Sequence, residues 1–178
     1  TRLFFDKLGA SRVRGSLCDA TGIMGYVYGF GSRRNHDIED LKRSERIVNW
    51  GKDLSRSSIH TAAVIRAARR RGTNVMTISP GGDGNDAFSD LSIRIRPGTD
   101  RFLAAAVIRR FVDTDRIDAG ILSRTKKWDR FRGLIEGRSL SSLAEACDVG
   151  LQDIETLFSW YADPSPTATL IGAGLQRY

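Results

Sequence analysis

Apolar and polar residues follow one another in the middle of the chain in the pattern of an α/β fold. The apolar run at residues 46–50 ends at Gly51 and predicts a buried strand that meets a turn. Apolar positions at helical spacing follow, from a cap at Ser57 or Ser58 through Arg71 to a stop at Gly72. The segment therefore predicts a strand, a turn and a helix in succession.

Two further apolar runs extend this alternation. Residues 74–78 predict a second strand before a loop rich in glycine, and residues 91–95 predict a third. A helical pattern begins again at Asp100 and continues through Phe111. Strands alternating with helices build a parallel sheet with helices packed on it, so we expect a Rossmann-like α/β fold.

The rest of the chain is predicted to be mostly helical before it returns to a strand. Residues 126–163 have helical patterning, Ser142 to Glu145 has the form of a capping box, and residues 167–171 predict a final strand. We expect four parts: a leading segment at 1–45, an α/β core at 46–125, a helical appendage at 126–165, and a strand and loop at 166–178.

Composition indicates an ordinary globular chain. Its 178 residues are 40% hydrophobic and 28% charged, and no run is apolar enough for a membrane helix. Two cysteines and two histidines make neither a disulfide framework nor a zinc cluster, and Cys147 has the spacing of a core residue. The chain starts without methionine and stops just after an apolar run, so we expect both ends to be cuts in a longer polypeptide.

Positive charge is concentrated in the first part of the sequence. Residues 1–72 hold 15 of the 28 Lys and Arg but only 7 of the 21 Asp and Glu, a net charge of +8 within a total of +7. This asymmetry favours an anionic partner such as a nucleic acid, an acidic protein or a pyrophosphate cofactor. Arginines that are only exposed to water on a helix face, with no anionic partner, would give the same net charge.

Three turns carry the candidate chemistry, and each follows or precedes a predicted element. Residues 50–57 join a strand to a helix, which is where parallel sheets bind phosphates. Residues 79–83 follow the second strand, where ribose or base is recognised. In residues 98–100 an aspartate is placed to accept hydrogen bonds from a guanine edge, although Thr99 or Asp100 would also serve as a helix cap. The residues singled out are Trp50, Gly51, Lys52, Asp53, Ser57, Ser79, Pro80, Gly81, Gly82, Asp83, Gly98, Thr99 and Asp100.

Taken in order, these turns resemble those of the molybdopterin oxidoreductases, the superfamily of dimethyl sulfoxide reductase and formate dehydrogenase. That family has a Trp-Gly-x-Asn turn, an Ile-Asp-Pro-Arg loop and a Pro-Gly-Thr-Asp turn, which line one molybdopterin guanine dinucleotide. Residues 50–53, 78–81 and 97–100 match them, with Asp53, Ser79 and Gly81 departing from the pattern. The last segment resembles the family's Gly-x-Gly-x-Gln-Arg loop, which adds Gly172, Gly174 and Gln176.

The resemblance implies a molybdenum bis(molybdopterin guanine dinucleotide) cofactor, with this chain as an internal fragment that holds one arm and is inactive alone. Cys18 matches the position that ligates the metal in the family, and a soft thiolate suits such a metal. A 4Fe-4S cluster would lie before Thr1. The implied partners are a small redox substrate, other domains of the same chain and an iron–sulfur electron-transfer subunit. Neither nucleic acid nor membrane contact is expected.

Three alternatives remain open. A nicotinamide-dependent α/β enzyme fits the fold, but the Gly-x-Gly-x-x-Gly fingerprint is missing at residues 50–57. A degenerate, non-catalytic scaffold is supported by Ser79 and Gly81. A helix-turn-helix DNA-binding module is suggested by residues 141–157, but the second helix there holds acidic residues and no Lys or Arg, so it would repel phosphates.

Overall fold

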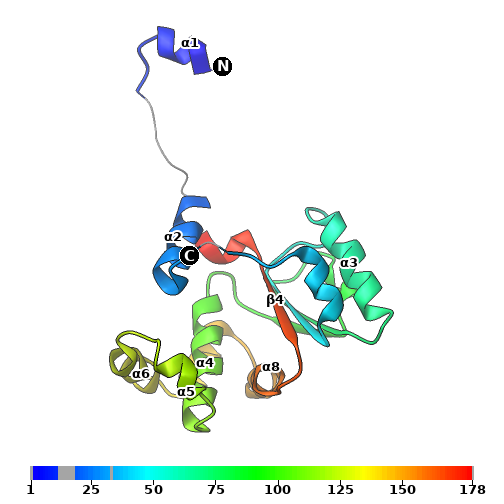
Figure 1. Ribbon diagram of the computed structural model, residues 1–178, viewed down its shortest axis with the longest axis vertical. Coiled ribbons are helices and arrows are strands. Elements are labelled where there is room, and N and C mark those ends of the chain that lie inside the picture. Colours follow the sequence, from blue (N-terminus) through cyan, green and yellow to red (C-terminus); the bar gives the residue numbers. More distant parts are fainter. Residues whose placement is uncertain (1, 12–18, 33, 178) are drawn as a thin grey trace. The chain divides into compact units, whose positions relative to one another are not determined.

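The computed structural model describes residues 2–11, 19–32 and 34–177 (Figure 1). The chain forms two compact units, Thr1–Asn35 and His36–Tyr178, and most contacts are made within a unit. No helix in these described ranges is long and apolar enough to cross a membrane. The first unit contains α1 (Arg2–Lys7) and α2 (Asp19–Phe30). The elements of the second unit are η1 (Ile38–Arg43), β1 (Arg46–Trp50), α3 (Ile59–Arg69), β2 (Asn74–Ser79), η2 (Asn85–Phe88), β3 (Leu91–Arg94), α4 (Asp100–Asp113), α5 (Ala119–Leu122), α6 (Trp128–Glu136), α7 (Leu140–Cys147), α8 (Leu151–Ala162), β4 (Thr167–Ile171) and η3 (Ala173–Arg177).

A four-stranded sheet in the order β3-β2-β1-β4 is the centre of the second unit, and every pair in it is parallel. This confirms the predicted α/β fold, and all four predicted strands are present. Because parallel strands all run in the same direction, the four strands end at one side of the sheet. Their last residues are Trp50, Ser79, Arg94 and Ile171. We call this side the carboxyl edge. The three predicted turns must lie at this edge if they bind one ligand together.

Helices cover both faces of the sheet, which explains why its central strands are buried at every position but the first. Ile47 and Val75 pack with α3 and η1 on one face. Val48 and Met76 pack with α4, α7 and α8 on the other. Side chains of α7 and α8 enter this second cluster, so the stretch expected to be an appendage, residues 126–165, supplies a layer of the core. The four-part division at 45, 125 and 165 stays a prediction.

The expected helix caps differ in detail from the structure. The predicted capping box at Ser142 is wrong, because α7 begins earlier and the Ser139 hydroxyl accepts the Ser142 N–H at 3.1 Å. Ser58 does precede α3, but its side chain makes no capping hydrogen bond, and α3 ends at Arg69 instead of Arg71. Serine clusters offer several equivalent caps, so the sequence alone does not choose among them.

An ion pair fastens the end of α8 to the start of the sheet. Arg46 Nη2 lies 3.1 Å from Asp163 Oδ2, and the Ser165 N–H donates to Asp163 Oδ1 at 2.8 Å. The hydrogen bonds from Ser165, with those from Arg46, hold the pKa of Asp163 well below its ordinary value. A lowered pKa stabilises the fold above the pKa of the unfolded chain, and this stabilisation is lost as the pH falls through the folded pKa.

We therefore expect Asp163→Asn to lower the free energy of unfolding at neutral pH, and we expect the difference from the wild type to shrink as the pH falls below about 4. Urea denaturation at a series of pH values measures this. Asp129→Asn, which removes an exposed carboxylate in α6, is the control for the loss of one negative charge. A difference that stayed constant with pH would contradict this account.

Candidate functional site at the carboxyl edge

The first two predicted turns are joined by hydrogen bonds. The Ser55 hydroxyl donates to the Asp83 carbonyl at 2.6 Å, and the Arg56 guanidinium donates to the Gly82 carbonyl at 3.2 Å. The Gly51 N–H also bonds to the carbonyl of Ile78 at 2.9 Å. Turns that lie about 30 residues apart in sequence thus form one surface, as their positions at the ends of neighbouring parallel strands predicted.

The third turn is tied to the first by a side-chain pair. The indole Nε1 of Trp50 donates to Asp100 Oδ1 at 2.8 Å, while the indole ring is packed in the core. Gly98 adopts a left-handed φ of 76°, which brings the chain into α4 at this point. Thr99 occupies the N-cap position, but its hydroxyl donates to the Arg96 carbonyl at 2.6 Å. Neither Thr99 nor Asp100 is therefore a capping side chain, and Asp100 is held toward the first turn.

The closing loop meets the first turn backbone to backbone. The Gly172 N–H donates to the Trp50 carbonyl at 2.7 Å, and a Cβ at Gly172 would lie 1.9 Å from the carbonyl oxygen of Gly51. A side chain is impossible there without movement of the backbone. Gly174 has open space around its Cα, and the side chain of Gln176 lies outside the described structure. The need for glycine at 172 is thus explained by packing on Gly51.

Asn85 holds the first two turns together, and it was not among the predicted site residues. Its amide is fully buried; Oδ1 accepts the Leu54 N–H at 2.9 Å, and Nδ2 donates to the Lys52 carbonyl at 2.9 Å and to Asp83 Oδ2 at 2.8 Å. Asn49 donates to the same Lys52 carbonyl at 3.0 Å. An asparagine in a loop rich in glycine and aspartate has no sequence feature that marks it as a clamp.

Replacing Asn85 with alanine is expected to lower the free energy of unfolding by about 2 kcal/mol, because it leaves the N–H of the buried Leu54 unpaired, while the Lys52 carbonyl keeps its bond from Asn49. Amide hydrogen exchange at Leu54 should become faster in the same variant. The exposed Asn74 is the matched control, and its change to alanine should alter neither quantity. Unchanged exchange at Leu54 in Asn85→Ala would show that the clamp is dispensable.

The carboxylate of Asp53 is bonded within the first turn. Asp53 Oδ1 accepts the N–H of Ser55 at 3.1 Å and the N–H of Arg56 at 3.0 Å. It also lies 2.9 Å from the Ser55 hydroxyl, whose single proton it shares with the Asp83 carbonyl. The Ser55 hydroxyl bond, followed by the bond and charge of Arg56, lowers the pKa of Asp53. The Ser57 hydroxyl donates a hydrogen bond to the Asp53 carbonyl at 2.9 Å. Asp53, present where the family has asparagine, is therefore occupied inside its own turn.

Several backbone donors of the site remain free. The N–H groups of Lys52, Asp53 and Gly82 have no acceptor among the described residues. In the second turn Pro80 is exposed, and the buried Ser79 hydroxyl accepts the Gly81 N–H at 3.2 Å. Free N–H groups at the carboxyl ends of parallel strands are the usual means by which such folds hold phosphate oxygens.

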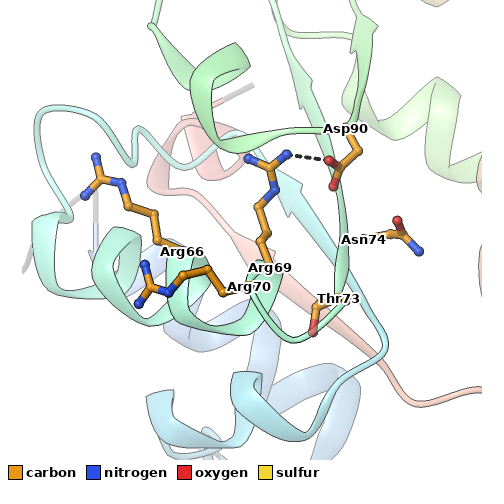
Figure 2. A pocket seen from close by; sticks show the side chains of 7 residues that line it. Arg66, Arg69, Arg70, Thr73, Asn74 and Asp90 are labelled. Carbon is orange, nitrogen blue, oxygen red and sulfur yellow. Dashed lines mark hydrogen bonds and ion pairs between the residues drawn. The ribbon is translucent and has the colours of Figure 1, made fainter.

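Part of the basic charge of residues 1–72 lies at the other end of α3. Figure 2 shows a pocket lined by Arg66, Arg69 and Arg70, beside the start of β2. Arg69 is paired with Asp90, whose Oδ2 also accepts the Val75 N–H at 2.8 Å, and Arg66 lies 4.5 Å over the Phe88 ring. These arginines therefore have structural partners or cover the last turn of α3, where cations are favoured.

Cys18 falls outside the described residues, so its predicted role as a metal ligand stays a prediction. Cys147 is fully buried and its thiol donates to the Leu143 carbonyl at 3.2 Å, which confirms the expected core position; burial raises its pKa. In the described ranges no three His, Cys, Asp or Glu side chains gather as a metal-binding group.

Comparison with known proteins adds a family context. The probable oxidoreductase YyaE of Bacillus subtilis is 29% identical over 99% of this chain, which spans 26% of that protein. The assimilatory nitrate reductase of Haloferax mediterranei is 26% identical over 91% of the chain and 22% of its own length. Among solved structures, acetylene hydratase of Pelobacter acetylenicus superposes with a TM-score of 0.77 at 17% identity, over 90% of this chain and 22% of that one.

No family model matches the chain. It spans about a quarter of the length of the first curated relatives that it matches, 26% for YyaE.

Proposed function

Since this chain is homologous to the molybdopterin oxidoreductases, we propose that its carboxyl edge binds one guanine dinucleotide arm of a molybdenum–pterin cofactor. The metal and pterin would supply the oxidation and reduction. The side chains described above would bind the nucleotide, orient it and exclude water from it.

The single observation that carries this proposal is the position of Asp100. Its carboxylate is partly exposed where the third turn meets the first, with one oxygen held by Trp50 and no partner on the other among the described residues. Guanine presents adjacent N1–H and N2–H donors, which suit one carboxylate. A fixed aspartate at the carboxyl edge of a parallel sheet is thus suited to select guanine over other bases.

The remaining residues fit the arm unequally. The free N–H groups of Lys52, Asp53 and Gly82 suit pyrophosphate oxygens, as does the Lys52 ammonium, which has no partner in the described part of the chain. Ser79, where the family has aspartate, is buried and already bonded, so it suits a ribose less well. We therefore place the recognition in the first and third turns, and the second turn contributes chiefly backbone.

The test is nucleotide selectivity of the protein prepared without its cofactor. Guanosine diphosphate, which carries the base and two phosphates, should bind about tenfold more tightly than inosine diphosphate, which lacks the 2-amino group. Adenosine diphosphate should bind more weakly still. Equal binding of the three nucleotides would show that Asp100 does not recognise guanine. Binding of none of them would favour a non-catalytic scaffold, which the departures from the family pattern at Ser79 and Gly81 support.

The proposal extends to groups beyond the described residues. We propose Cys18 as the metal ligand, a small redox substrate, and electron transfer through an iron–sulfur cluster and the protein that carries it, as the family resemblance implies. Cys18→Ser should then remove one sulfur neighbour from the X-ray absorption spectrum of the metal. If spectrum and turnover both stayed as in the wild type, Cys18 would be only a packing residue.

A further inference from the structure

Arg94 lies against the second turn in a way that the sequence pattern does not suggest. It is the last residue of β3, so its side chain starts at the carboxyl edge. Its Nη1 lies 3.5 Å from the Ser79 hydroxyl, at the limit of a hydrogen bond. Its Nη2 lies 2.6 Å from Asp86 Oδ2 in η2. The guanidinium is thus held over the turn by groups on two sides.

The absence of a side chain at residue 81 makes room for this arrangement. A Cβ built on Gly81 would lie 3.0 Å from Arg94 Nη1 and 3.4 Å from Cζ. Gly81 also has a φ of 99°, a conformation that residues with side chains rarely adopt. The guanidinium therefore lies directly beside the backbone of the one turn residue where the family pattern has arginine and this chain has glycine.

Arg94 retains hydrogen-bonding capacity after these contacts. A guanidinium has five N–H donors, and Asp86 and Ser79 occupy only part of them. The Arg94 side chain is 47% exposed, and Asp86 is itself positioned by the Ser92 hydroxyl at 2.9 Å. The result is a cation with a fixed direction and free donors, beside the turn that contains Gly82, whose N–H has no acceptor among the described residues.

We infer that Arg94 is a nucleotide-binding residue of this chain: its guanidinium supplies to the second turn the positive charge that Gly81 does not, and it bonds a phosphate oxygen of the bound nucleotide. The inference rests on the proposed function. Planar guanidinium groups recognise phosphate through paired N–H donors, a geometry that lysine does not provide. A plain surface ion pair with Asp86 is the competing explanation, and such pairs contribute little to stability.

The test measures guanosine diphosphate binding by the protein prepared without its cofactor. Arg94→Gln is expected to weaken the affinity about tenfold, because a charge-assisted bond is lost, and Arg94→Lys is expected to restore it only in part. The matched control is Arg70→Gln, which removes an arginine at the other end of α3 (Figure 2). Guanosine, which has no phosphate, should bind the wild type and Arg94→Gln equally.

Two results would separate this inference from the proposed function. If the wild type binds guanosine diphosphate and Arg94→Gln binds it as well, Arg94 is only the partner of Asp86 and the inference fails alone. If the wild type does not bind guanosine diphosphate, the proposed function itself fails. A loss of affinity matched by Arg70→Gln would mean a general effect of charge and would also overturn the role of Arg94.

Discussion

Replacing Gly172 with alanine is expected to destabilise the chain by about 3 kcal/mol or more, near the upper end of the range for inserting atoms into a packed region. The new Cβ would lie 1.9 Å from the Gly51 oxygen and 2.6 Å from the Lys52 nitrogen. Both contacts are with backbone, which cannot rotate away as a side chain does. The first turn must therefore move, and nucleotide affinity should fall with stability.

Gly174 provides a matched control two residues away. Nothing lies within 4 Å of a Cβ built there, so Gly174→Ala should leave the urea midpoint within error of the wild type. If the two variants were equally stable, the close approach between Gly51 and Gly172 would not be a constraint on the fold.

Asp100→Asn is expected to weaken guanosine diphosphate binding by about 10- to 100-fold, because each hydrogen bond to a charged group contributes about 1.5–3 kcal/mol. An amide also presents N–H donors toward the donors of guanine. The advantage over inosine diphosphate should disappear with the carboxylate. Competition binding with the two nucleotides measures both effects.

Two further variants show whether the effect belongs to Asp100 itself. Trp50→Phe keeps an aromatic ring in the core but removes the N–H that holds Asp100, so it should give a smaller loss of selectivity. Asp129→Asn, at an exposed carboxylate in α6, should give none. Full selectivity in Asp100→Asn would locate guanine recognition elsewhere.

The strands could be predicted because burial on both faces leaves a strong signal. Three of the five residues are apolar in each of the segments 46–50 and 74–78, and turn residues follow both segments. The role of residues 140–162 was harder to predict, since an apolar helix face has the same pattern whether it covers a sheet or another helix. Only the packing of Leu143 and Phe158 on the sheet side settles it.

The site was predictable where it follows from topology and unpredictable where it follows from packing. Turns at the ends of parallel strands must meet, so the joining of residues 50–57 with 79–83 was expected. The clamp by Asn85 and the placing of Arg94 over Gly81 depend on side-chain directions that no spacing encodes. The positive net charge of residues 1–72 did not locate the site, because the arginines at 66–71 lie at the far end of α3.

The most direct test of the proposed cofactor site is the chemical analysis of the protein purified from a host that makes the molybdenum cofactor. We predict molybdenum together with guanine nucleotide, released by acid and identified by chromatography, and a lower nucleotide content in Asp100→Asn than in Asp129→Asn. A well-folded preparation that contained neither molybdenum nor guanine nucleotide would contradict the account.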